Sequence, residues 1–121
     1  GDAWLYHFTR NPGKGRSENQ GVFHGLDVAY VFNYTQGTLV GETDKALAVD
    51  MLRRWTNFAK TGNPNGSGDP DSAPETVAPA WPKYSTAEDR YIDFGDKIEV
   101  RANLDTEECD LIDRVFELRK K

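Results

Sequence analysis

Residues 21–32 read GVFHGLDVAYVF, which places His24 between two glycines and directly before an apolar segment. Gly21 and Gly25 let the backbone turn tightly and leave room beside the imidazole ring. Because an imidazole titrates near neutral pH, a histidine held on a loop can act as a general base. On this spacing alone, however, a loop histidine that is satisfied locally is the commoner arrangement. Residues 26–32 predict a short apolar helix.

The segment before His24 predicts a strand followed by a loop. Residues 4–8 read WLYHF, with apolar side chains on both faces, which is typical of a buried strand in a parallel sheet covered on each side. Residues 11–20 are rich in Gly, Pro, Asn and Ser and predict a loop. A buried strand followed by a helix favours an α/β fold.

Residues 43–61 contain the clearest helical pattern in the chain. Thr43 is a plausible N-cap, Asp44 lies in the first turn, and Gly62 is a plausible stop. The apolar residues that recur at steps of three and four, and so form one stripe, are Leu47, Ala48, Met51, Leu52, Trp55, Phe58 and Ala59.

The rest of the chain predicts a loop, a hairpin and a final helix. Residues 62–79 have the composition of a flexible surface loop. Residues 91–94 and 98–101 predict two strands joined around Gly95-Asp96-Lys97. Residues 105–108 resemble a capping box that opens a helix. The apolar residues of this helix, which lie mainly on one face, are Leu111, Ile112, Val115, Phe116 and Leu118.

Composition narrows the functional classes. The 121 residues suffice for one small domain, and the net charge of −5 gives no electrostatic footprint for nucleic acid or an anionic membrane. No stretch approaches the length of a membrane span, and the opening residues do not have the pattern of a signal peptide. Cys109 is the only cysteine, which rules out an internal disulfide. The chain enters a strand-like run soon after Gly1 and its only methionine is Met51, so we expect it to be part of a longer protein.

No complete catalytic constellation is present in the sequence. A G-x-S-x-G nucleophile elbow is absent, and Gly66-Ser67-Gly68 has the wrong spacing. His7 and His24 are seventeen positions apart, which excludes a His-x-x-x-His metal pair. Cys109 is predicted to be a half-buried structural thiol. His7 lies within the predicted strand and is more simply a packing or edge residue.

Three motifs in series resemble the type B carboxylesterase family, which includes the cholinesterases. Residues 21–32 are similar to the family's catalytic-histidine segment, in which histidine and glycine precede an acidic residue and an aromatic-apolar helix. Residues 54–65, RWTNFAKTGNPN, are similar to the family's Trp-x-x-Phe-Ala-x-x-Gly-x-Pro stretch. Residues 80–84, AWPKY, followed by residues 91–94, YIDF, form the third match.

The resemblance implies an α/β-hydrolase fold, here its C-terminal part, with the last strands of a mostly parallel sheet, covering helices and a hairpin. In such enzymes the triad runs Ser, acid, His along the chain, so a C-terminal piece should carry the histidine alone. His24 is then the catalytic residue, acting as general base toward a serine and general acid toward the leaving alcohol. Asp27 matches an acidic family position near the active site and takes a supporting role. The triad carboxylate lies outside this chain, and neither a cofactor nor a metal is implied.

The expected function is hydrolysis of a small carboxylic ester by the full-length protein. The expected partner is its missing N-terminal part, and the segment alone should be inactive. Two alternatives stay open. The chain could belong to a non-catalytic adhesion or scaffolding relative that keeps the histidine segment but lacks the serine. It could also be a free-standing binding module. We further expect the isolated segment to self-associate through its orphaned strand edge and the apolar face formed by Leu47, Met51, Trp55 and Phe58.

Overall fold

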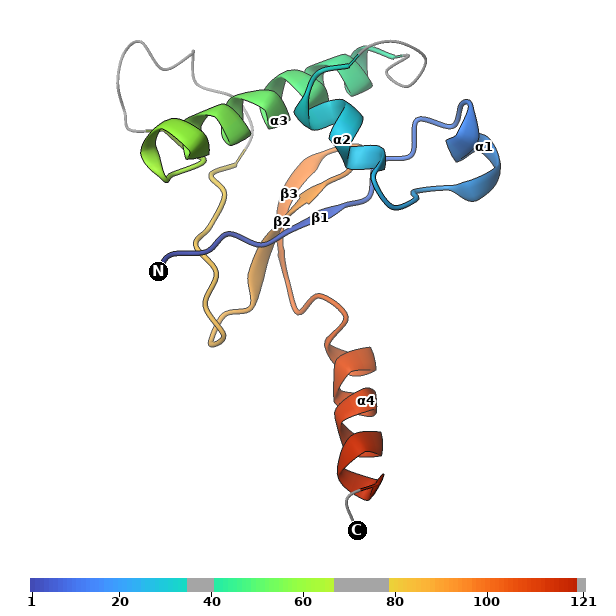
Figure 1. Ribbon diagram of the computed structural model, residues 1–121, viewed down its shortest axis with the longest axis vertical. Coiled ribbons are helices and arrows are strands. Elements are labelled where there is room, and N and C mark those ends of the chain that lie inside the picture. Colours follow the sequence, from blue (N-terminus) through green and yellow to red (C-terminus); the bar gives the residue numbers. More distant parts are fainter. Residues whose placement is uncertain (35–40, 67–78, 120–121) are drawn as a thin grey trace.

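A small mixed sheet forms the centre of the protein (Figure 1). The computed structural model describes residues 1–34, 41–66 and 79–119. Strand β1 (Tyr6–Phe8) runs parallel to β2 (Arg90–Phe94), and β2 pairs antiparallel with β3 (Ile98–Ala102). The predicted hairpin is therefore confirmed, and the sheet contains both a parallel and an antiparallel pair.

Helices α2 (Leu26–Val31) and α3 (Glu42–Thr61) pack together over one face of this sheet (Figure 1). A single cluster of buried side chains joins both helices to the strands, and it consists of Phe8, Leu26, Tyr30, Leu47, Ala48, Met51, Trp81, Ile92 and Phe94. The two helices thus owe their stability to tertiary burial, because a helix as short as α2 is marginal by itself.

Aromatic side chains fill the space between the sheet and the second half of α3. The Tyr6 ring centroid lies 5.2 Å from that of Trp55 and 5.9 Å from that of Trp81, both in edge-to-face geometry. Trp81 also donates its indole N–H to the carbonyl oxygen of Leu5 across 2.9 Å. Asn65 accepts from the Trp81 backbone N–H at 2.7 Å and donates to its carbonyl oxygen at 2.8 Å. The second and third sequence motifs therefore meet around β1.

The predicted strand at residues 4–8 is shorter and less buried than expected. Only Tyr6–Phe8 has strand geometry, and His7 is exposed between part-buried Tyr6 and buried Phe8. Side chains alternate between the faces of a strand, so Tyr6 and Phe8 point to α2 and α3 while His7 lies on the face those helices do not cover. The apolar-on-both-faces interpretation was wrong at His7.

Two details of the helices also differ from the sequence predictions. The predicted loop at residues 11–20 contains a short helix, α1 (Arg16–Gln20), where the Ser17 hydroxyl donates to the Lys14 carbonyl oxygen at 2.8 Å. The N-cap of α3 is Gly41 and not Thr43, because the Asp44 carboxylate accepts the Gly41 backbone N–H at 3.0 Å and so starts the helix earlier. The predicted stop at Gly62 is confirmed by its left-handed backbone, with a φ of 73°.

The two long helices differ in how well their apolar faces are covered. In α3, Leu47 and Met51 are buried, although we expected them to lose part of their partner surface. Phe58 is half-exposed, and its ring packs against that of Trp4. Helix α4 (Thr106–Arg119) extends away from the sheet and buries none of its residues (Figure 1). In the described part of the chain, no helix has the length and apolar character needed to cross a membrane. Most of the predicted surface loop at 62–79, residues 67–78, lies outside the described residues.

Candidate active site

His24 lies in the turn that leads into α2, and its side chain is exposed. The Leu26 backbone N–H donates to the Phe23 carbonyl oxygen at 3.1 Å, which closes the turn around the histidine. Gly25, with a φ of 85°, occupies the left-handed region that favours glycine, so its place after His24 has a structural reason. Among the described residues, no hydrogen bond or ion pair engages the exposed imidazole ring.

The helix behind His24 is anchored on the protein core. Leu26 and Tyr30, one turn apart on α2, are both buried against α3. Phe23, directly before His24, is part-buried against the same core, and the guanidinium of Arg16 lies 4.4 Å from the centre of its ring. His24 is therefore an exposed side chain on a backbone held from both sides.

Asp27 lies in the first turn of α2 and is engaged by β1. The Tyr6 hydroxyl donates to Oδ2 of Asp27 across 2.7 Å. Burial, and then the hydrogen bond to this carboxylate, raise the pKa of Tyr6 to about 12, so the phenol is a neutral donor at physiological pH. The sequence identified Asp27 but not Tyr6, because only the packing of β1 beneath α2 brings the two together.

His7 occupies a different environment from His24. It lies on the opposite sheet face from α2, with its ring edge-on to that of Tyr91 at 6.3 Å between centroids. This contact fits the packing role expected of His7. Cys109, by contrast, is exposed on α4, so the prediction of a half-buried thiol was wrong. The described part of the chain contains no group of three or more His, Cys, Asp or Glu side chains arranged to hold a metal.

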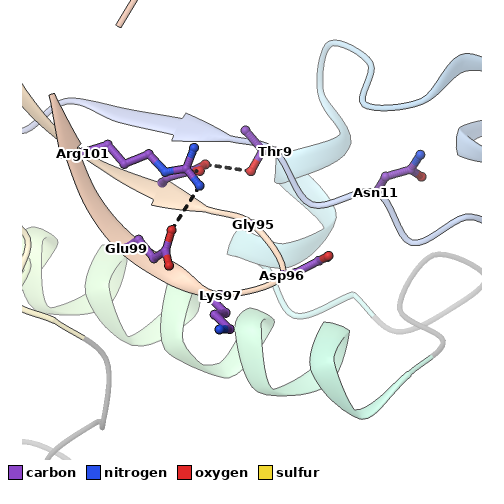
Figure 2. Close-up of a pocket in the computed structure, with 8 residues that line it drawn as sticks. Thr9, Asn11, Gly95, Asp96, Lys97, Glu99 and Arg101 are labelled. Carbon is purple, nitrogen blue, oxygen red and sulfur yellow. Dashed lines mark hydrogen bonds and ion pairs between the residues drawn. The ribbon is translucent and has the colours of Figure 1, made fainter. Parts of the chain in front are cut away.

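A polar cleft of about 390 Å³ lies at the turn of the β2–β3 hairpin (Figure 2). Neither His24 nor Asp27 lines it. Within it, the buried Asp93 carboxylate accepts the Thr9 hydroxyl at 2.7 Å and lies 3.2 Å from the Arg101 guanidinium. Arg101 also pairs with Glu99 at 3.0 Å. Arg101 therefore bridges two carboxylates across the sheet. The sequence did not predict this cleft, which arises from the pairing of β2 with β3.

Comparisons with known proteins place these features in a family. The family model described as the carboxylesterase family matches residues 1–112. The chain belongs to this family. All three motifs quoted above fall inside the matched region, as do His24 and Asp27.

Curated relatives of this carboxylesterase-family chain include two cholinesterases. Acetylcholinesterase 1 of Caenorhabditis elegans is 30% identical over 104 residues, which cover 78% of this chain and 15% of the relative. Cholinesterase of Mus musculus is 27% identical over 112 residues, which cover 89% of this chain and 17% of the relative. The chain thus spans about a sixth of the length of these relatives.

Solved esterase structures share its fold. A PNB esterase superposes with a TM-score of 0.70 at 26% identity and covers 90% of this chain and 21% of its own. A thermophilic PNB esterase superposes with a TM-score of 0.69 at 25% identity and covers 88% and 21%. The small mixed sheet with α2 and α3 is accordingly a portion of the α/β-hydrolase fold, and the predicted fold class is confirmed.

Proposed function

We propose that this chain is the histidine-bearing segment of a longer carboxylic ester hydrolase, called here the parent esterase. His24 serves as the general base of its serine triad. One observation carries the proposal: the His24 imidazole is exposed and makes no hydrogen bond to the described residues, while Leu26 and Tyr30 of the helix behind it are buried. The chain that presents it belongs to the carboxylesterase family. A base must present a free nitrogen at a fixed place, and this arrangement provides one.

The proposed chemistry divides between His24 and the rest of the parent esterase. His24 accepts the proton of a serine hydroxyl as that oxygen attacks the ester carbonyl. It then returns the proton to the departing alcohol, which leaves an acyl-serine. Water attacks the acyl-serine in the same way, and His24 again takes a proton and returns it to the serine. The serine, the triad carboxylate and the oxyanion hole come from segments outside this chain.

Asp27 takes a supporting role in this proposal. Its Oδ2 already accepts the Tyr6 hydroxyl, and it follows His24 by only three residues on the same turn. A carboxylate bound in this way is suited to fixing the first turn of α2, and thereby the backbone of His24, and less suited to pairing with the imidazole. Tyr6 is then its partner in positioning.

Steady-state kinetics of the parent esterase test the proposal. His24→Ala should lower kcat for a p-nitrophenyl ester about a thousandfold or more, by analogy with triad deletions. The matched control is His7→Ala, which removes the other imidazole from the far face of the sheet and should leave kcat within about twofold. Similar losses in both folded variants would mean that the wrong histidine is assigned. A parent protein without any esterase activity would favour the scaffolding alternative.

The isolated segment provides a second test. Without a nucleophile beside His24, residues 1–121 alone should not turn over a p-nitrophenyl ester. A His24-dependent turnover by the segment would contradict the division of labour proposed here.

A further inference from the structure

The buried carboxylate of Asp44 collects hydrogen bonds from three separate parts of the chain. Arg10 Nε lies 2.6 Å from its Oδ1, and the Tyr30 hydroxyl donates to the same oxygen at 2.9 Å. The Gly41 backbone N–H donates to Oδ2 at 3.0 Å. Asp44 itself is only 1% exposed, so these groups are its whole shell of donors within the described structure.

Helix capping alone does not account for this arrangement. The contact with Gly41 is all that an acidic residue in the first turn of α3 needs, and such residues usually face water. Burying the carboxylate with a guanidinium incurs a large desolvation cost, and a buried ion pair is weak evidence for stability. The best-attested use of such pairs is to hold one arrangement of the chain against others.

The two side chains on Oδ1 lie on either side of His24 in the sequence. Arg10 is the second residue after β1, where the backbone N–H groups of Thr9 and Arg10 both donate to the Phe94 carbonyl oxygen, at 3.0 and 3.1 Å. Tyr30 lies on α2, six residues after His24, and its ring packs 4.9 Å from that of Phe8. The two ends of the segment 10–30 are thus bound to a single oxygen atom, Oδ1 of Asp44.

The Arg10 side chain also binds the β2–β3 hairpin. Arg10 Nη1 lies 2.6 Å from Oδ1 of Asp96, which is at the β2–β3 turn and points away from Glu99 in Figure 2. Arg10 is therefore bound on two sides, by the first turn of α3 and by the hairpin. Fixing both ends of a loop reduces the number of conformations open to its middle, and His24 lies in that middle.

We propose that Asp44 is a positioning residue for His24, acting as a clamp that joins the two ends of the segment 10–30 and so fixes the imidazole relative to the sheet. The inference rests on the proposed function and adds a residue that does not touch the reacting atoms. Reacting groups need near-ideal placement, and a displacement of about 1 Å can cost up to a hundredfold in rate.

The test removes one bond of the clamp at a time in the parent esterase. Tyr30→Phe deletes a single hydroxyl and keeps the buried ring, while Asp44 retains Arg10 and Gly41. It should lower kcat on the order of tenfold and leave KM within about twofold, because substrate binding is untouched. The matched control is Tyr91→Phe, a buried tyrosine on the opposite sheet face, which should keep kcat within about twofold. Rates are expressed per active site, counted by exhaustive fluorophosphonate labelling and intact mass, so that misfolded protein does not enter.

A double-mutant cycle decides whether both ends act through Asp44. The kcat of the double variant Arg10→Gln with Tyr30→Phe should be no more than about threefold below that of the less active single variant, since either substitution breaks the same clamp. The control pair, Arg101→Gln and Tyr91→Phe, carries the same changes away from Asp44 and should leave kcat unchanged.

His24→Ala, measured alongside, separates the two claims. If His24→Ala is inactive but Tyr30→Phe keeps the wild-type kcat per active site, the positioning role of Asp44 is wrong and the proposed function stands. If His24→Ala is active, both are wrong. Should Arg10→Gln fail to fold, the kcat of Tyr30→Phe against Tyr91→Phe decides alone.

Discussion

The Tyr6 hydroxyl lies 2.7 Å from Oδ2 of Asp27 and fastens the first turn of α2 to β1. Tyr6 cannot move freely, because its ring packs edge-on against Trp55 and Trp81. The aromatic cluster beneath α3 thus holds the Tyr6 hydroxyl against Asp27, which lies three residues after His24. Trp55 and Trp81 belong to the second and third family motifs, and Asp27 belongs to the first. Through Tyr6, the second and third motifs therefore support the first.

Removing that hydroxyl should affect both stability and rate. In the parent esterase, Tyr6→Phe loses a hydrogen bond to a part-exposed charged group and should destabilise the fold by about 1 to 2 kcal/mol. If Asp27 positions His24, kcat should also fall several-fold at a temperature where both proteins are folded. Thermal unfolding and steady-state kinetics measure the two effects. Wild-type kcat in a variant with the expected loss of stability would show that the contact is structural only.

The Asp44 clamp predicts a specific response to acid. Burial alone would raise the pKa of Asp44, but the hydrogen bonds from Arg10, the Gly41 N–H and Tyr30 outweigh it and hold the pKa below its ordinary value. A carboxyl whose pKa is lowered by folding contributes stability at pH values above its unfolded pKa of about 4, and that stability is lost as the pH falls through the folded pKa. Denaturant titrations of the parent esterase between pH 6 and pH 3 should therefore show a steeper loss of stability for wild type than for Asp44→Asn. Parallel losses would contradict the prediction.

Local patterns in the sequence sufficed for much of this fold. The spacing of Leu47 and Met51 predicted α3, and the residues around Gly95 predicted the hairpin, because both signals depend on near neighbours. His24 was predicted as the general base from residues 21–32, where the glycines and the apolar helix are contiguous. The sequence did not predict the positioning roles proposed for Tyr6 and Asp44, because these depend on contacts across 21 and 34 residues of sequence. The exposure of His7 likewise depends on what covers the sheet.

Association of the isolated segment is a further prediction, and the structure changes its location. Leu47 and Met51 are buried, whereas the apolar side chains of α4 are exposed, with Phe116 at 56% and Leu111 at 57%. Strand β1 also lies at an edge of the described sheet. Exposed apolar faces and open strand edges favour association. At micromolar concentration, sedimentation should detect dimers or larger species, together with binding of the dye ANS.

Charged substitutions on α4 provide the control for this prediction. Leu111→Glu with Phe116→Glu should reduce both association and ANS binding, while Glu117→Gln on the same helix should change neither. A wild-type segment that sediments as a compact monomer, unfolds cooperatively and does not bind ANS completes its own core. That result would favour the free-standing binding module.

The most direct test of the central claim is the acylation burst of the parent esterase, because His24 is proposed to act while the serine attacks. Wild-type protein mixed with excess p-nitrophenyl acetate in a stopped-flow instrument should release about one equivalent of p-nitrophenol per active site before the steady state. In His24→Ala the rate constant of this phase should fall about a thousandfold or more, and in His7→Ala it should be unchanged. A burst of wild-type rate in folded His24→Ala would show that His24 is not the general base.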